Sequence, residues 1–159
     1  MKTIEKDILT VEDGFILHQV NAQGVMGSGV AKGIRDKWHR VYDEYKKKCH
    51  HITEYCGAWA LMGHAQIVEV SPSLSVVNLF AQYDYRKNPF DNQQYTEYGS
   101  FAYALKDFVN KSSWSFLDHE REVYLPYKIG SDRGGADFSI ISEIVKEIIP
   151  QAIFCKLPN

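Results

Sequence analysis

Residues 18–31 read His-Gln-Val-Asn-Ala-Gln-Gly-Val-Met-Gly-Ser-Gly-Val-Ala. The apolar run 15–20 predicts a strand, and the residues after Gly29 have helical spacing, so this stretch predicts a strand–turn–helix unit. The start of a helix presents unpaired backbone N–H groups and a partial positive charge, which together bind anions. The glycines at 24, 27 and 29 let an anion approach the backbone closely, because glycine has no Cβ. We therefore expect this turn to bind a phosphate group.

The spacing of these glycines excludes the two commonest nucleotide-binding motifs. A Walker loop requires lysine directly after G-x-x-x-x-G, but Val30 follows the glycines at 24 and 29. The dinucleotide-binding fingerprint requires G-x-G-x-x-G, but Lys32 occupies its last position. A turn that only connects a strand to a helix is the remaining alternative, since such units are common.

A second glycine-rich stretch repeats this arrangement near the end of the chain. A short apolar run, 123–125, precedes Pro-Tyr-Lys-Ile-Gly-Ser-Asp-Arg-Gly-Gly-Ala-Asp-Phe at 126–138. Apolar residues with helical spacing follow over 140–148, and Asp137 is a candidate N-cap for that helix. Two such turns can grip one diphosphate from both sides, so we expect them to form a single site.

Three segments resemble signatures of one known family, the macro domain, a module that binds ADP-ribose. Residues 20–31 resemble its first signature, in the Met-Gly-x-Gly-(Ile/Val)-Ala form of phage and bacterial proteins and of ADP-ribose-1''-phosphate phosphatases. Residues 125–138 resemble the second signature, and residues 4–9 resemble the opening Gly-Asp-Ile segment with Lys6 in place of glycine. The segments occur in the family's order, and the resemblance spans essentially the whole chain.

The resemblance implies an α/β fold, a three-layer α/β/α macro-domain sandwich around a central mixed sheet, as a single domain over residues 1–159. The alternation of strands and helices in the sequence independently favours a parallel or mixed sheet covered on both faces. We expect strands near 2–6, 14–20, 57–62, 65–70, 75–81, 122–125 and 152–156, and helices near 29–46, 95–111 and 137–149. Ligands bind such open sheets at the carboxyl ends of the strands, where both glycine-rich turns are expected.

By the resemblance, ADP-ribose lies along both turns. Asp7 accepts a hydrogen bond from the adenine amino group, Phe138 packs near the adenosine, and Asn21 contacts the distal ribose with an amide that both donates and accepts. Backbone N–H groups of both turns hold the diphosphate. Ordinary structural alternatives are a turn role for Asp7 and Asn21 and a core position for Phe138. The expected ligand-binding residues are Asp7, Ile8, Asn21, Gly27, Ser28, Gly29, Val30, Ile129, Gly130, Ser131, Asp132, Arg133, Gly134, Gly135 and Phe138.

Three residues are candidates for catalysis: Asn21, His18 and Asp132. His18 replaces the first asparagine of the family's signature, and a histidine of near-neutral pKa can act as a base or nucleophile. A regular strand places His18 and Asn21 on opposite faces, so a structural histidine is an equal alternative. Asp132 replaces a glycine common in related sequences and is either a general base or a solvated loop acid. Arg133 beside it can neutralise this acid or contact phosphate.

We expect a protein that binds ADP-ribose and hydrolyses its derivatives by removing the terminal phosphate of ADP-ribose-1''-phosphate. The alternatives are a hydrolase that removes ADP-ribose from protein or nucleic acid, and a non-catalytic ADP-ribose reader or scavenger. Gln82 stands where some macro domains that release ADP-ribose from glutamate or DNA have lysine, which disfavours a lysine-mediated covalent route. The long polar and aromatic segment 82–98 has the character of a lid.

Composition narrows the remaining possibilities. A net charge of −2 disfavours a domain that coats nucleic acid. No apolar run approaches a membrane span of about 18–20 residues, and the charged start lacks the apolar stretch of a signal peptide. We therefore expect a cytoplasmic monomer whose partner is ADP-ribose or an ADP-ribose-containing substrate, without a membrane partner.

The cysteines do not suggest a metal site or a disulfide framework. Cys49, Cys56 and Cys155 include no C-x-x-C pair, and reduced thiols suit the cytoplasm. The segment Cys-His-His at 49–51, with a further cysteine at 56, fits no standard zinc spacing. We expect a solvated helix end there, with no metal and no cofactor.

Overall fold

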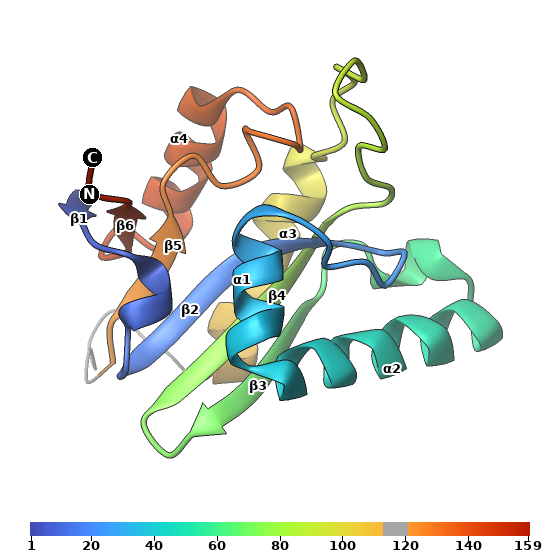
Figure 1. Cartoon of the computed structure of the whole chain (residues 1–159), viewed down its shortest axis with the longest axis horizontal. Helices are drawn as coiled ribbons and strands as arrows, with labels where there is room; N and C mark the ends of the chain where they lie inside the picture. The colour runs from blue at the N-terminus through green and yellow to red at the C-terminus, as the bar shows by residue number, and fades with distance from the viewer. Residues whose placement is uncertain (113–120) are drawn as a thin grey trace.

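A mixed six-stranded sheet forms the centre of the molecule in the computed structural model, which describes residues 1–112 and 121–159 (Figure 1). The strands lie in the order β1-β6-β5-β2-β4-β3, and all neighbours are parallel except the β3–β4 hairpin. This sheet between helical layers confirms the predicted fold class. The strand bounds are β1 Lys2–Glu5, β2 Gly14–Asn21, β3 Ala65–Ser71, β4 Leu74–Gln82, β5 Val123–Pro126 and β6 Ile153–Lys156.

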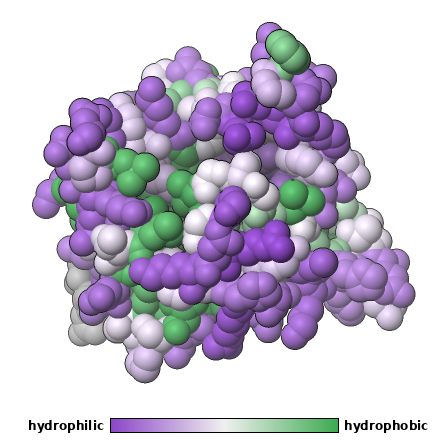
Figure 2. Space-filling model, viewed as in Figure 1, coloured by the Kyte–Doolittle hydropathy of each residue, from purple (hydrophilic) through white to green (hydrophobic). Residues whose placement is uncertain are grey.

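Two pairs of helices cover the two faces of the sheet (Figure 1). Helices α1 (Gly29–Lys37) and α2 (His39–Tyr55) lie on one face, and α3 (Tyr98–Ser112) and α4 (Phe138–Ile148) lie on the other. Two short 3₁₀ helices, η1 (Ile8–Thr10) and η2 (Ala58–Leu61), complete the described elements. Seen from the α1 side, most of the surface is hydrophilic, with hydrophobic side chains in smaller areas between (Figure 2).

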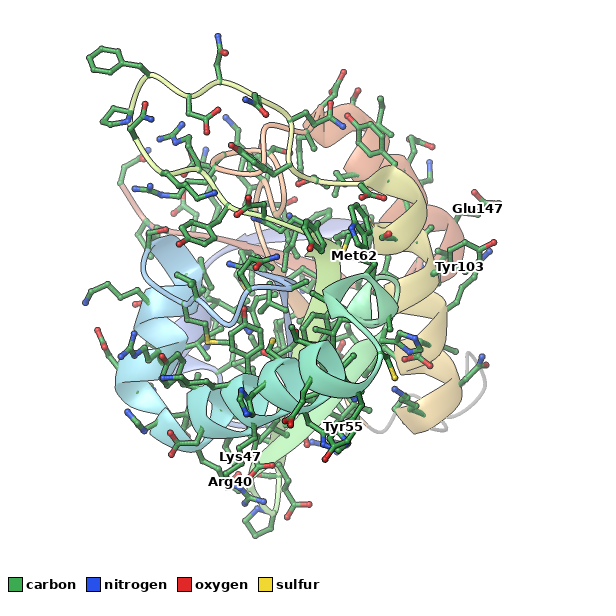
Figure 3. The ribbon with its side chains drawn as sticks, turned by 90° about the vertical axis from the view of Figure 1, so that its right-hand side faces the viewer. Arg40, Lys47, Tyr55, Met62, Tyr103 and Glu147 are labelled. Atoms are coloured by element: carbon green, nitrogen blue, oxygen red, sulfur yellow. The ribbon has the colours of Figure 1, made fainter. Side chains whose placement is uncertain are left out.

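Each face of the sheet has its own hydrophobic core. Along β2, Phe15 and Leu17 pack beneath α3 and α4, whereas Ile16 and Val20 pack beneath α1 and α2. This alternation follows from the two-residue period of a strand. On α2, the apolar side faces the sheet while Arg40 and Lys47 point outward (Figure 3). The central strands therefore have apolar residues on both sides, which explains their continuous hydrophobic runs.

The expected single helix over 29–46 is wrong, because Trp38 divides it. Trp38 has φ −126° and ψ 77°, outside the helical region, and its N–H donates to Ile34 O as the last bond of α1. A new helix begins at His39 and continues to Tyr55. Apolar residues keep helical spacing on both sides of the break, so the sequence pattern does not register the change of direction.

Two further expectations for the region 49–62 are wrong. The predicted strand at 57–62 is the 3₁₀ helix η2, in which Ala58 and Leu61 are buried at a spacing of three residues rather than two. The predicted solvated helix end at 49–51 is the continuing body of α2. Cys49 is buried against the core, and burial raises the pKa of its thiol to about 11.

Candidate functional site

A pocket of about 450 Å³ lies at the carboxyl ends of β2, β4 and β5. This volume falls within the ~300–1,000 Å³ typical of small-molecule sites. Both glycine-rich loops line it, so the structure brings together most of the residues that the sequence singled out. The predicted site residues on its wall are His18, Asn21, Gly27, Ser28, Gly29, Val30, Ile129, Gly130, Asp132, Arg133 and Gly134.

The first glycine-rich loop leaves the start of α1 open. Ser28 is the N-cap residue, but its backbone is extended and its side chain makes no capping hydrogen bond. Within the described residues, the N–H groups from Gly27 to Val30 have no hydrogen-bond partner. These donors point from a helix N-terminus that carries partial positive charge, which suits a phosphate oxygen.

The second loop contributes through its own backbone rather than through a helix end. Asp137 caps α4 as predicted, because its carboxylate accepts from Ser139 N at 2.9 Å. The N-terminus of α4 is therefore capped by the Asp137 carboxylate, and of the two helix ends expected to face a phosphate only that of α1 lacks a side-chain cap. In the loop itself, Ser131 N donates to Lys128 O at 2.9 Å and Gly135 N donates to Asp132 O at 3.3 Å.

The remaining donors of this loop differ from the expected set. In the described part of the chain, the N–H groups of Gly130, Asp132, Arg133 and Gly134 have no partner. These four residues also line the pocket. Backbone N–H groups that converge on a concave loop form an anion site. Asp132, Arg133 and Gly134 belong to the predicted donors, residues 131–135, whereas Gly130 precedes them, and the binding of phosphate by these groups stays a prediction.

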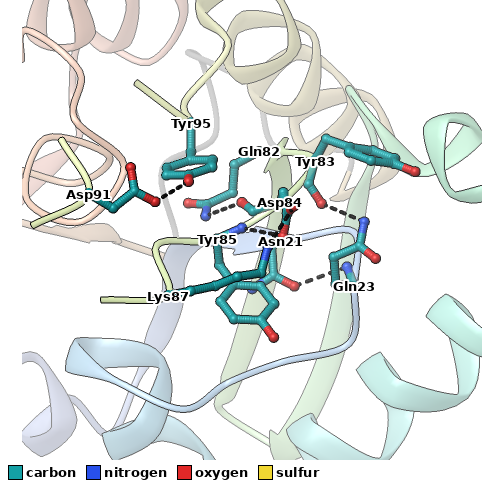
Figure 4. Close-up of polar contacts among 9 residues, drawn as sticks. All are labelled: Asn21, Gln23, Gln82, Tyr83, Asp84, Tyr85, Lys87, Asp91 and Tyr95. Atoms are coloured by element: carbon teal, nitrogen blue, oxygen red, sulfur yellow. Dashed lines mark hydrogen bonds and ion pairs between the residues drawn. The ribbon is translucent and has the colours of Figure 1, made fainter. Parts of the chain in front are cut away.

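Asn21 holds the first loop in shape. Its side-chain oxygen accepts from Gln23 N at 3.0 Å (Figure 4). The same oxygen accepts from Val25 N at 3.3 Å, and the amide nitrogen donates to Val25 O at 2.8 Å. The β2–β4 register shifts between Val20 and Asn21, so alternation does not continue to the end of the strand. This irregularity turns Asn21 toward α2, where the Tyr45 hydroxyl donates to it.

His18 belongs to a buried row of polar side chains that crosses three strands. His18 pairs with Asn78 on β4, and Asn78 pairs with Gln66 on β3. Asn78 Nδ2 donates to Gln66 Oε1 at 3.0 Å, which leaves Asn78 Oδ1 to accept from His18 Nε2 at 2.6 Å. The neutral imidazole therefore carries its proton on Nε2, and Nδ1 is a free acceptor.

Burial keeps this imidazole neutral. His18 is 1% exposed, and desolvation lowers its pKa from 6.5 to about 4, although the Asn78 hydrogen bond acts in the opposite direction. The expectation of a near-neutral pKa is therefore wrong, because a charged imidazole would lose its hydration here. Nδ1 has no partner among the described residues, so it can accept a hydrogen bond but is a weak base.

A network of side-chain hydrogen bonds connects the segment after β4 to the second loop. Gln19 Nε2 donates to Gln82 Oε1 and to Thr96 Oγ1, both at 2.7 Å. Thr96 Oγ1 in turn donates to Gly130 O at 2.8 Å, and Thr96 N donates to Gly134 O at 3.0 Å. A Cβ at Gly134 would lie 2.2 Å from Thr96 Oγ1, so this close approach requires glycine.

Several residues that the sequence singled out lie outside the pocket wall. Asp7 caps η1 by accepting from Leu9 N at 3.0 Å, and Ile8 is buried in the core. Phe138 packs edge-on against Tyr127 at 5.0 Å between ring centroids. Their contacts with adenosine remain predictions. The predicted ligand residues outside the lining are Asp7, Ile8, Ser131, Gly135 and Phe138.

The structure adds residues that sequence reasoning missed. The additional lining includes Gln19, Tyr85, Arg86, Tyr127 and Lys128. The sequence could have indicated Gln19 as a site residue, because it is a polar residue within a mostly apolar strand. Tyr85 and Arg86 lie in the segment 82–98 that the sequence indicated as a lid, but the composition of this segment does not specify which of its side chains reach the pocket.

The described residues include neither a cluster of metal-ligating side chains nor a helix that could span a membrane. Within residues 1–112 and 121–159, no three His, Cys, Asp or Glu side chains converge as metal ligands would. The described helices also include none whose length and hydrophobicity would allow it to cross a bilayer.

Comparison with known proteins identifies the architecture. No family model and no curated protein matches the sequence. Among solved structures, a protein of unknown function from Bacteroides thetaiotaomicron has a TM-score of 0.79 and 22% identity, over 98% of this chain and 97% of that one. A macrodomain protein from Streptomyces coelicolor has a TM-score of 0.74 and 18% identity, over 99% of both chains. The chain has the macrodomain fold.

A third similar structure was determined with a ligand. Thermosipho africanus DarTG, in complex with ADP-ribose, matches with a TM-score of 0.71 and 15% identity, over 98% of this chain and 41% of that one. The macrodomain architecture agrees with the resemblance seen in the sequence. In this chain both glycine-rich loops lie at one end of the sheet, around one pocket.

Proposed function

We propose that this macrodomain protein binds ADP-ribose in the pocket between its two glycine-rich loops. The observation that carries the proposal is the convergence of free N–H groups from the start of α1 and from residues 130 and 132–134 on one cavity. Donors on two sides of a pocket suit the two phosphates of a diphosphate. The ADP-ribose complex of a similar structure supports this choice of ligand.

We further propose hydrolysis of the terminal phosphate of ADP-ribose-1''-phosphate. Asp132 lines the pocket, is exposed, and forms no ion pair among the described residues, so it is free to accept a proton from water. The water oxygen attacks phosphorus, the bond between phosphorus and the oxygen on C1'' breaks, and the leaving sugar oxygen takes the proton that Asp132 accepted from water. The products are inorganic phosphate and ADP-ribose.

A second candidate function is a non-catalytic ADP-ribose reader. The observation that favours it is the commitment of His18 and Asn21 to hydrogen bonds within the fold. The pKa of His18 is lowered to about 4, and the Asn21 side-chain oxygen already accepts three hydrogen bonds, so Asp132 is the member of the predicted catalytic set with the fewest contacts inside the fold. Binding without turnover is the outcome that distinguishes this function.

Calorimetry and phosphate release test the proposal. We expect ADP-ribose to bind with micromolar affinity, about −8 kcal/mol, and AMP to bind more weakly because it lacks the second phosphate. Phosphate release from ADP-ribose-1''-phosphate should fall in Asp132→Asn while ADP-ribose affinity is retained. Absence of ADP-ribose binding refutes the whole proposal, and binding without phosphate release supports the reader. Release of ADP-ribose from a mono-ADP-ribosylated protein in a parallel assay would indicate the other hydrolase.

A further inference from the structure

Arg86 lines the same pocket with an unused hydrogen-bond donor. It lies on the segment after β4, and its Nε atom is buried without a partner in the described part of the chain. An arginine side chain is always charged and has only donors, so a buried unpaired N–H is costly unless a ligand supplies the acceptor. Arg86 is therefore a group whose natural partner is an anion.

The acids near Arg86 in the sequence are already engaged. Asp84 accepts from Lys87 Nζ at 2.8 Å, and Asp91 accepts from the Tyr95 hydroxyl (Figure 4). Neither carboxylate forms an ion pair with Arg86, and no other acid of the described residues does. The charge of Arg86 contributes to lowering the pKa of Asp91 without forming an ion pair, so the hydrogen-bond donors of Arg86 remain available to a ligand in the pocket.

The residues that precede Arg86 are fixed against the first loop. Tyr83 O accepts from Gln23 Nε2 at 2.9 Å (Figure 4). The Tyr83 ring stacks on Trp59 with centroids 4.1 Å apart. Asp84 O accepts from Gln82 Nε2 at 2.8 Å. These contacts place the start of the segment beside Asn21, at the end of the pocket where the resemblance puts the distal ribose.

The charge on the pocket wall exceeds what a diphosphate needs. The lining includes three cationic side chains, Arg86, Lys128 and Arg133, but one acid, Asp132. The free N–H groups of both loops already supply donors for two phosphates. An additional cation on the first-loop side therefore favours a ligand with a further anionic group at that end.

We infer that Arg86 is a specificity-determining residue that binds a phosphate-sized anion on the distal ribose of the ligand. The guanidinium forms charge-assisted hydrogen bonds to this anion, a geometry that suits phosphate oxygens. The inference rests on the proposed binding of ADP-ribose and explains how the site prefers a phosphorylated form to ADP-ribose itself.

The test compares two ligands and two charge-removing variants. The ligands are ADP-ribose and its 1''-phosphonomethyl analogue, whose C–P bond is not hydrolysed. Arg86→Gln removes the proposed contact. Lys87→Gln is the matched control, because Lys87 has the same charge one residue further on, is exposed, and lies outside the pocket wall. Affinities of both ligands are measured by calorimetry for the wild type and both variants.

We expect Arg86→Gln to weaken the phosphonate analogue by about 10- to 100-fold and ADP-ribose by less than about threefold. Lys87→Gln should leave both affinities within about twofold. An equal loss for both ligands would assign Arg86 to the shared diphosphate and overturn the inference, while the proposed function would stand. Unchanged affinity for both would also overturn it. A wild type that binds neither ligand would overturn the proposed function as well.

Discussion

The Tyr45 hydroxyl donates to two oxygens of Asn21, the backbone carbonyl at 2.7 Å and the side-chain oxygen at 2.9 Å. Tyr45 is completely buried on α2, and burial raises the pKa of its hydroxyl, so the group remains a proton donor. This contact joins the core beneath α2 to the residue that shapes the first glycine-rich loop. The position of the free N–H groups in that loop therefore depends on packing some distance from the pocket.

Replacement of Tyr45 tests this dependence. Tyr45→Phe keeps the ring and removes both hydrogen bonds, so we expect the free energy of unfolding to fall by about 1–3 kcal/mol. ADP-ribose affinity should fall severalfold because the loop loses one support. Tyr42→Phe is the control, since the Tyr42 hydroxyl makes no hydrogen bond with the described residues. Chemical denaturation and calorimetry measure the two effects, and equal results for the two variants would contradict the coupling.

Asn21→Ala should destabilise the protein and weaken ligand binding together. The variant loses the bonds to Gln23, Val25 and the Tyr45 hydroxyl through its side chain, and these hold the loop rather than a bound sugar. We expect a loss of about 2–3 kcal/mol in the free energy of unfolding. Melting temperature, affinity and phosphate release should be measured on one preparation. A variant of unchanged stability with a large loss of turnover would instead place Asn21 in catalysis.

A charge placed at position 27 should abolish binding without unfolding the protein. Gly27 has no positive φ, and a Cβ there would meet Val25 at an ordinary 3.7 Å, so a side chain fits. Gly27→Glu places a carboxylate beside the free N–H groups and repels a diphosphate, whereas Gly27→Gln adds the same bulk without charge. Gly29 is less suitable, because its φ of +59° strains any side chain.

We expect Gly27→Glu to bind ADP-ribose at least about tenfold more weakly than Gly27→Gln, with similar melting temperatures. Calorimetry at low and high salt checks that the difference is electrostatic, because salt screens charge but not bulk. Equal affinities for the two variants would show that the loop does not hold the phosphates.

The buried His18 predicts a loss of stability in mild acid. Its pKa is about 4 in the folded protein against 6.5 when unfolded, so the unfolded chain binds the proton more tightly between these pH values. The stabilisation is complete above pH 6.5 and is lost as pH falls toward 4. Its full size is about 3 kcal/mol, since one pKa unit corresponds to ~1.4 kcal/mol.

Denaturant unfolding at several pH values measures this slope. In His18→Gln the slope between pH 6.5 and 4 should be shallower than in the wild type, because the titrating group is gone. His50→Gln is the control, since the His50 side chain is 83% exposed on α2. A wild-type slope that survives unchanged in His18→Gln would assign the acid sensitivity to other groups.

The capped end of α4 gives a prediction that separates stability from binding. Asp137→Ala removes the bonds to Ser139, and we expect a melting temperature lower by ~2–4 °C. Asp137→Asn keeps an acceptor and should lose less. ADP-ribose affinity should be unchanged in both, because Asp137 lies outside the pocket wall. A clear loss of ADP-ribose affinity in Asp137→Ala would show that the α4 N-terminus contributes to ligand binding.

The resemblance of three segments to macro-domain signatures implied the macrodomain fold. The sequence pattern by itself determined the α/β class and the two loops of the pocket. These features depend on short stretches of sequence. Each consists of a strand of apolar residues, a turn whose glycines have greater backbone freedom, and a helix whose apolar spacing begins directly after the turn. The Asp137 cap is local as well, since its acceptor and the Ser139 donor are two residues apart. Contacts between residues this close in the chain can be predicted directly from the sequence pattern.

Only the tertiary structure decided which polar side chains of the site are free to contact a ligand. The pKa of His18 depends on Asn78 and on burial between two strands 60 residues apart in sequence. The engagement of Asn21 depends on a register shift and on Tyr45 of a helix that the sequence pattern did not separate from α1. Arg86 reaches the pocket through a segment without periodicity. Desolvation and hydrogen-bond partnership arise from residues brought together by folding, so local pattern cannot assign them.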